Sequence, residues 1–110
     1  MERIELENIS FENFDRISVQ IASHVYRNLA GFSMKRSNTV SEQQMLHTTS
    51  FHKNGEYILL EFHYDIQSQT LIIDMQLAYV GTPSNHSDFI GLVRNKVLPA
   101  MNKYRPVVAA

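Results

Sequence analysis

The feature that most restricts the fold of this chain is the stretch Lys53-Asn54-Gly55-Glu56, which lies between two runs of strand-forming residues. An Asn-Gly pair tolerates the positive φ angles of a type I′ turn, and this turn joins two antiparallel strands in a fixed register. With Asn54 and Gly55 in the turn, Phe51 faces Ile58 on one side of the pair and Leu46 faces His63 on the other. One local signal therefore assigns the side chains of both strands to their faces.

Residues 69–80 are predicted to form a third strand, because apolar residues alternate with other residues over the whole run. One face of this strand is expected to belong to the core, and it carries Leu71, Ile73, Met75, Leu77 and Tyr79. A tight connection through residues 66–68 places Glu61 opposite Asp74. Because Gln-Ser is a poor turn pair, a shift by two residues that places Asp74 opposite His63 stays open.

Two segments have the three- and four-residue spacing of apolar side chains that is typical of helices. The first begins after Ser10, a suitable N-cap, and Gly31 is placed to end it; its stripe consists of Phe14, Ile17, Ile21, Val25 and Leu29. The second has the stripe Phe89, Ile90, Val93, Val97, Met101 and Tyr104. Pro99 lies inside the second stripe, so we expect a kink or an early break near Leu98.

These elements predict a single α+β domain over residues 1–110. Its antiparallel sheet has three to four strands, and an N-terminal and a C-terminal helix pack on one face in an α-β-β-β-α order. Residues 3–9 alternate briefly, which fits an edge strand or an ordered lead-in. Residues 33–42 are polar, so we expect a mobile loop there, with a short strand over residues 32–36 as the alternative. The element order is similar to the first half of secretion-chaperone-like folds, a likeness of topology alone.

Composition excludes several classes of function. The chain has no cysteine, which rules out disulfide frameworks and cysteine-bound zinc, and its 10 Lys and Arg against 11 Asp and Glu give no net field that attracts nucleic acid. The four glycines stand singly, which excludes a P-loop and a dinucleotide fingerprint, and no apolar run is long enough to span a bilayer. We therefore expect a cytoplasmic, non-enzymatic protein with no cofactor, no membrane contact and no nucleic-acid partner.

The sheet face turned away from the helices is expected to carry more apolar side chains than a solvated face needs. These residues are Leu46, Tyr57, Leu59, Ile72 and Ala78. We therefore expect a small protein-binding or homodimerising module, with a regulatory or chaperone-like role, that uses this face or a free sheet edge as its contact surface. The alternative is that residues 1–9 or 32–40 fold back over the face and cover it within one chain.

Three polar residues on the same face, Glu61, His63 and Asp74, suggest a second class of function. Two carboxylates beside an imidazole can hold a divalent metal or a small ligand. The plainer interpretation is a solvated sheet face, on which alternating polar residues are expected, and the sequence favours it.

Overall fold

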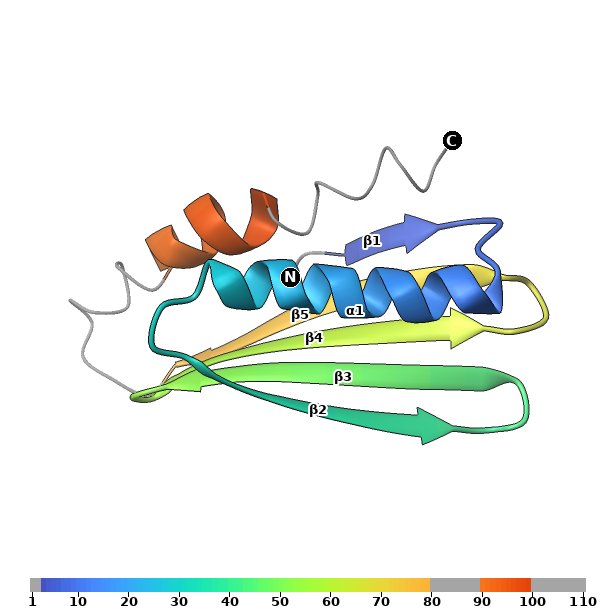
Figure 1. The fold of residues 1–110 in the computed structure, drawn as a ribbon, viewed down its shortest axis with the longest axis horizontal. Helices are drawn as coiled ribbons and strands as arrows, with labels where there is room; N and C mark the ends of the chain where they lie inside the picture. Colours follow the sequence, from blue (N-terminus) through green and yellow to red (C-terminus); the bar gives the residue numbers. More distant parts are fainter. Residues whose placement is uncertain (1–2, 80–89, 100–110) are drawn as a thin grey trace.

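The computed structural model describes residues 3–79 and 90–99 and shows a five-stranded antiparallel sheet with helices on one face (Figure 1). Along the chain the elements are β1 (Arg3–Leu6), α1 (Phe11–Arg27), β2 (Ser33–Val40), β3 (Gln44–Lys53), β4 (Glu56–Asp65), β5 (Thr70–Tyr79) and the helical turn η1 (Val93–Val97). In space the strands follow the order β1-β5-β4-β3-β2, so β1 and β2 are the edges. The α+β class is confirmed. The predicted three to four strands and the α-β-β-β-α order are wrong, because a strand precedes α1 and β2 completes the sheet.

The hairpin of β3 and β4 has the register that its Asn-Gly turn predicts. Asn54 and Gly55 have φ angles of 45° and 83°, which are the positive values of this turn. Phe51 pairs with Ile58 and Leu46 with His63. The faces assigned to these two strands from the sequence are therefore confirmed.

The connection from β4 to β5 is tight, and it resolves the open question of register in favour of Glu61 opposite Asp74. The Asp65 carboxylate stabilises the turn by accepting hydrogen bonds from the backbone amides of Gln67 (3.0 Å) and Ser68 (3.1 Å). Gln69 then adopts a positive φ of 55° and leads into β5. An aspartate at the end of β4 thus supplies the turn geometry that a Gln-Ser pair lacks.

Residues 33–40 form strand β2, so the expectation of a mobile loop there is wrong. β2 pairs with β3 along its whole length, from Ser33 opposite His52 to Val40 opposite Met45. All eight of its residues are exposed, which explains why apolar periodicity does not reveal the strand. Its stability comes from backbone pairing with β3 and from cross-strand bonds such as that between the hydroxyls of Ser37 and Thr48.

The N-terminal segment forms the other edge of the sheet, as its alternation suggested. β1 pairs with β5, with Ile4 opposite Ile73. The chain then turns at Asn8, whose φ is 59°, and the amide of Ile9 donates to the carbonyl of Gln69 at 2.9 Å. β1 and β2 therefore widen the sheet at its two edges, and neither segment covers its open face.

Helix α1 begins as the sequence predicts, because the Ser10 hydroxyl accepts a hydrogen bond from the amide of Asn13 at 3.2 Å. It ends at Arg27, and Gly31, with φ 81°, lies in the turn that follows. The stripe of α1 packs on the inner face of the sheet in a core that includes Ile4, Phe14, Ile17, Ile21, Val25, Phe51, Ile58, Leu60, Phe62, Leu71 and Ile73. At its centre the Phe14 ring lies 4.7 Å from Tyr64 and 4.6 Å from His47.

The second helix packs on the same face as α1, since Val93 and Val97 are buried in the same core. It contains a π-helical turn in which the Leu98 amide donates to the carbonyl of Val93. The ring of Pro99 would clash with the carbonyl four residues earlier in a regular α-helix, and the widened turn lies at that point. The predicted break near Leu98 is therefore replaced by a wider turn. The remaining predicted helical residues, 85–89 and 100–104, lie outside the described residues.

Candidate functional site

The open face of the sheet, opposite α1, carries every residue that the sequence assigned to an interface. Leu46 lies on β3, Tyr57 and Leu59 on β4, and Ile72 and Ala78 on β5. Ala78 is exposed and the other four are half-buried. Among the described residues no segment folds over this face, because residues 3–6 and 33–40 extend the sheet at its edges.

The strand register divides these apolar residues instead of joining them into one patch. Ile72 and Leu46 lie on either side of His63, which pairs with both. Leu59 pairs with Gln76 on one side and Ser50 on the other. Of the five apolar residues, only Tyr57 and Ala78 are direct cross-strand partners. Tyr57 and Leu59 also share this face, because they lie two residues apart on β4. The polar row of Thr48, Glu61 and Asp74 therefore divides the apolar residues into two groups, Tyr57 with Leu59 and Ala78, and Leu46 with Ile72. Each group is a smaller contact area than the sequence suggested.

The centre of the open face is a polar cluster that contains the three predicted ligand residues. His63 Nε2 lies 3.9 Å from Glu61 Oε2 and 3.8 Å from Asp74 Oδ2. Two further residues complete the cluster: Arg3 Nε lies 3.8 Å from Asp74 Oδ1, and the Gln76 amide donates to Glu61 Oε1 at 2.7 Å. Sequence reasoning missed Arg3 because its partner Asp74 lies on β5, far along the chain. The only signal in the sequence was a single basic residue among the N-terminal acids.

The geometry of the polar cluster is that of a surface charge network. Glu61 and Asp74 face each other, and like charges in that position repel unless cations balance them. Arg3 supplies a cation 3.8 Å from Asp74, and the His63 ring lies between the two carboxylates; all of these side chains stay in contact with water. Within residues 3–79 and 90–99, no group of three or more histidine and carboxylate side chains is arranged to hold a metal ion.

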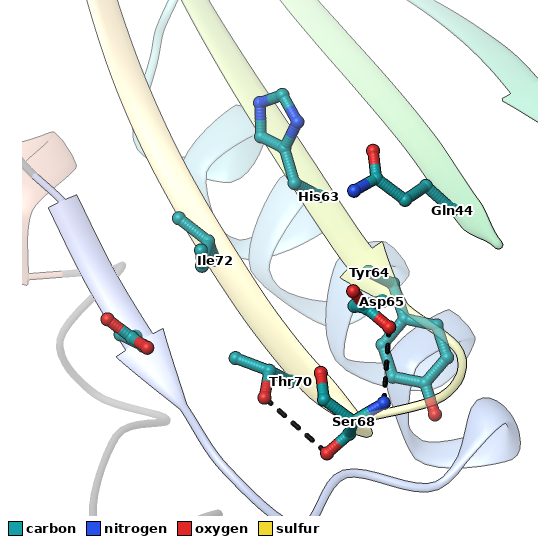
Figure 2. A pocket seen from close by; sticks show the side chains of 8 residues that line it. Gln44, His63, Tyr64, Asp65, Ser68, Thr70 and Ile72 are labelled. Carbon is teal, nitrogen blue, oxygen red and sulfur yellow. Dashed lines mark hydrogen bonds between the residues drawn. The ribbon is translucent and has the colours of Figure 1, made fainter.

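Beside the polar cluster the face is hollowed where β4 ends and β5 begins (Figure 2). The hollow has a volume of about 290 Å³ and is lined by Glu5, Gln44, His63, Tyr64, Asp65, Ser68, Thr70 and Ile72. Carboxylates on β1 and β4 lie at its rim, and Asp65 is held by its bond to the Ser68 amide, which Figure 2 shows. Most of the lining residues have polar side chains, and they include two acids and one histidine.

Strand β2 forms one edge of the sheet, and all eight of its residues are exposed. Among the strands of residues 3–79, it is hydrogen-bonded to β3 alone, and its other side is the border of the sheet, as Figure 1 shows. On its helix-facing side it carries Met34, Arg36, Asn38 and Val40, and α1 leaves all four exposed, with Met34 at 37% and Val40 at 66%. We call the outer side of β2 the free edge. The sequence suggested an interface at some edge, but a polar run without alternation did not identify this strand.

The hydrogen-bonding pattern defines which backbone groups the free edge offers. Just beyond the strand end, the Ser41 amide donates to the carbonyl of Gln44 at 2.8 Å. Hydrogen-bonded and non-hydrogen-bonded pairs alternate along an antiparallel ladder, so residues 33, 35, 37 and 39 direct their backbone groups toward β3. The amides and carbonyls that point outward therefore belong to Met34, Arg36, Asn38 and Val40.

Comparisons with models of protein families, with curated proteins and with solved structures found no match. In the described part of the chain, no helix has both the length and the apolar character that crossing a bilayer requires.

Proposed function

We propose that this protein is a non-enzymatic protein-binding module that takes up an extended segment of a partner along the free edge of β2. The observation that carries the proposal is the exposure of all eight residues of Ser33–Val40 on a strand that is paired on one side. Such an edge is a template for an added strand, because main-chain hydrogen bonds supply affinity without a specific side-chain sequence.

The charges of β2 indicate the chemistry of the added segment. Lys35 and Arg36 are adjacent in the strand and therefore point to opposite faces of the sheet, and β2 contains no acidic residue. A partner strand with acidic side chains on both faces meets a cation on each. The proposal therefore favours an acidic extended segment, whose affinity falls as salt increases.

The edge can be blocked without disturbing the fold, because the Asn38 amide points outward. In Asn38→Pro the ring occupies the position of that amide and removes a donor that β3 does not use. The matched control is Asn38→Ala, which keeps the backbone donor. We expect both variants to retain the wild-type circular dichroism spectrum.

The test is the binding of a fluorescent, end-capped peptide with the repeat Glu-Glu-Val-Val, which places glutamate on both faces of an extended strand, followed by anisotropy. We expect saturable binding to the wild type and to Asn38→Ala, and at least tenfold weaker binding to Asn38→Pro. Amide exchange measured by NMR should slow at Met34, Arg36 and Asn38 when the peptide is added. The proposal is wrong if no binding occurs, if Asn38→Pro binds as well as the wild type, or if protection falls on another strand.

A second candidate function is a small cationic ligand in the hollow of the open face. The observation that favours it is a depression of about 290 Å³ whose lining includes Glu5, Asp65 and His63. A compact diamine would match the charge of those carboxylates. This candidate ranks second because Asp74 and Glu61 next to the hollow already have cationic or amide partners within the chain.

Thermal melts with putrescine test the second candidate, because a ligand that binds only the folded state raises the melting temperature. We expect a rise that is smaller in Glu5→Gln. No rise with putrescine would eliminate the hollow as a site for a compact diamine.

The cysteine-free composition suits a reducing compartment, and we assign the module to the cytoplasm as part of the proposal.

A further inference from the structure

We infer that the free edge selects a partner segment of another protein with a defined order of side chains. Read from its amino end, the segment has an apolar residue, three residues of any type, two adjacent acidic residues and a second apolar residue. The inference rests on the proposed function, because it names the sequence that the same edge recognises. It is carried by the order of side chains along β2, where Met34, Lys35 and Arg36 stand together and Val40 stands apart.

The two acidic positions follow from two cations that lie on opposite faces of β2. Lys35 and Arg36 are the only adjacent Lys or Arg residues in the sequence. Their cross-strand neighbours on β3 are Ser50 and Thr49, which are uncharged. In the described part of the chain, no ion pair includes either cation. An added strand can therefore supply the missing carboxylates, one on each face of the sheet.

The two apolar positions follow from Met34 and Val40. Both lie on the helix-facing side of β2, where they are 37% and 66% exposed. An apolar residue opposite each of them would remove apolar surface from water, and such cross-strand pairs stabilise a sheet. Arg36 lies on the same side, so this row of the partner carries both apolar residues and one of the two acids.

The direction of the added strand determines the order in which these positions occur. The strand pairs described for this sheet are all antiparallel, and antiparallel pairing is slightly more stable per residue than parallel pairing. In an antiparallel partner the first residue lies opposite Val40, the fifth opposite Arg36, the sixth opposite Lys35 and the seventh opposite Met34. A parallel partner would need the reverse order, with its acids at the second and third positions.

The pattern also excludes a second copy of this chain as the partner. No two acidic residues are adjacent anywhere in the sequence, so no segment of a second copy carries the two acids. A second β2 would add two cations and no acid to the edge. Cations on an edge strand are a common means of preventing such pairing.

Two end-capped fluorescent peptides of identical composition test the order of the pattern. The first, Val-Thr-Gln-Thr-Glu-Glu-Val, matches it, and the second is the same sequence reversed. In anisotropy titrations we expect the wild-type chain to bind the first peptide about fivefold more tightly, because only this peptide sets carboxylates opposite Lys35 and Arg36 in an antiparallel pair. Equal affinity, or tighter binding of the reversed peptide, overturns the inference.

Charge reversal at Arg36 tests the register. We expect Arg36→Glu to weaken binding of the matching peptide about tenfold, and lysine at the fifth peptide position to restore it. Lysine at the sixth position, which lies opposite Lys35, should not restore it. The control Arg94→Glu changes the net charge equally at an exposed residue of η1, which lies across α1 from β2 in Figure 1, and should leave binding unchanged.

Loss of one apolar contact is the third measurement. Val40→Thr keeps the branched shape and the strand propensity of the side chain, so it should weaken binding about threefold through the lost apolar contact alone. Ile66→Thr, at an exposed apolar residue beyond the end of β4, is the control that should bind as the wild type does. Equal effects of the two substitutions would remove Val40 from the contact and overturn the pattern.

The outcomes separate this inference from the proposed function. If the Glu-Glu-Val-Val repeat binds at β2 while the matching and reversed peptides bind equally, the pattern is wrong and the proposed function stands. If lysine at the fifth and sixth positions restores binding to Arg36→Glu equally, the register is wrong and the inference is overturned. If none of these peptides binds at β2, both proposals are wrong.

Discussion

The Tyr64 hydroxyl forms a hydrogen bond that connects the sheet to the segment between β1 and α1. Removal of this hydroxyl tests how much the bond stabilises the fold. Tyr64 is 2% exposed, and its hydroxyl donates to the carbonyl of Ile9 at 2.6 Å. Its ring stacks on Phe14 with an angle of 8° between the planes. Tyr64→Phe keeps the stacked ring and removes only the hydroxyl, so it isolates the hydrogen bond.

The loss of this bond should lower the free energy of unfolding by about 1–2 kcal/mol. A buried hydrogen bond contributes about 0.5–1.5 kcal/mol net, and leaving a buried acceptor without its partner costs about 1–3 kcal/mol. Ile9 is 2% exposed, so water does not easily replace the phenol. With a urea dependence of about 1.5 kcal/mol per molar, the midpoint should fall by about 1 M.

Alkaline pH provides an independent measurement on the same side chain. Burial, and then the charge of Asp65, raises the pKa of Tyr64 above the ordinary value of 10.0. The folded state therefore holds the phenol proton more tightly than the unfolded state. This contribution to stability is complete below pH 10 and is lost as pH rises through the raised pKa. The stability difference between the wild type and Tyr64→Phe should therefore narrow above pH 10.

The assay is urea denaturation followed by circular dichroism at pH 7 and at pH values above 10, with Tyr26→Phe as the control. Tyr26 lies on α1 and is 42% exposed, so its hydroxyl should contribute less than about 0.5 kcal/mol. If Tyr64→Phe and Tyr26→Phe shift the midpoint equally, the bond to Ile9 does not stabilise the fold. A stability difference that widens at alkaline pH would contradict the reasoning on the pKa.

Other elements give further expectations. Burial lowers the pKa of His47 below 6.5, and the charge of Asp15 partly opposes this. The contribution of His47 to stability is therefore complete above pH 6.5 and is lost as pH drops through the lowered pKa. His47→Leu should reduce the dependence of the unfolding free energy on pH between pH 7 and pH 5 in urea titrations, and an unchanged dependence would assign it to other groups. Asp65→Ala should cost about 1 kcal/mol by removing both turn acceptors, whereas Asp65→Asn retains an amide oxygen and most of the stability. Asp74→Asn removes a repulsion from Glu61 and a weak ion pair with Arg3, and these two effects oppose each other. The free energy of unfolding measured with urea should therefore change by no more than about 0.5 kcal/mol. A loss above about 2 kcal/mol would indicate a buried site instead.

Local signals in the sequence determined the elements that carry their own geometry. The Asn54-Gly55 turn determined the register of β3 and β4, because only a few residue pairs tolerate two successive positive φ angles. The cap at Ser10 and the stripe behind it determined α1, and strict alternation determined β5. Glu61, His63 and Asp74 could be placed on one face for the same reason, since a period of two residues leaves no freedom once the register is known.

Other features depend on residues that meet only after the chain has folded. β2 is a strand because β3 offers it a paired edge, and a strand exposed on both faces needs no apolar alternation to be stable there. Arg3 reaches Asp74 only because β1 returns to β5 across most of the chain. On the open face, the polar row of Thr48, Glu61 and Asp74 divides the five apolar residues into two groups. Sequence periodicity assigns a side chain to a face, but its neighbours on that face come from other strands, and strand order is decided by tertiary pairing.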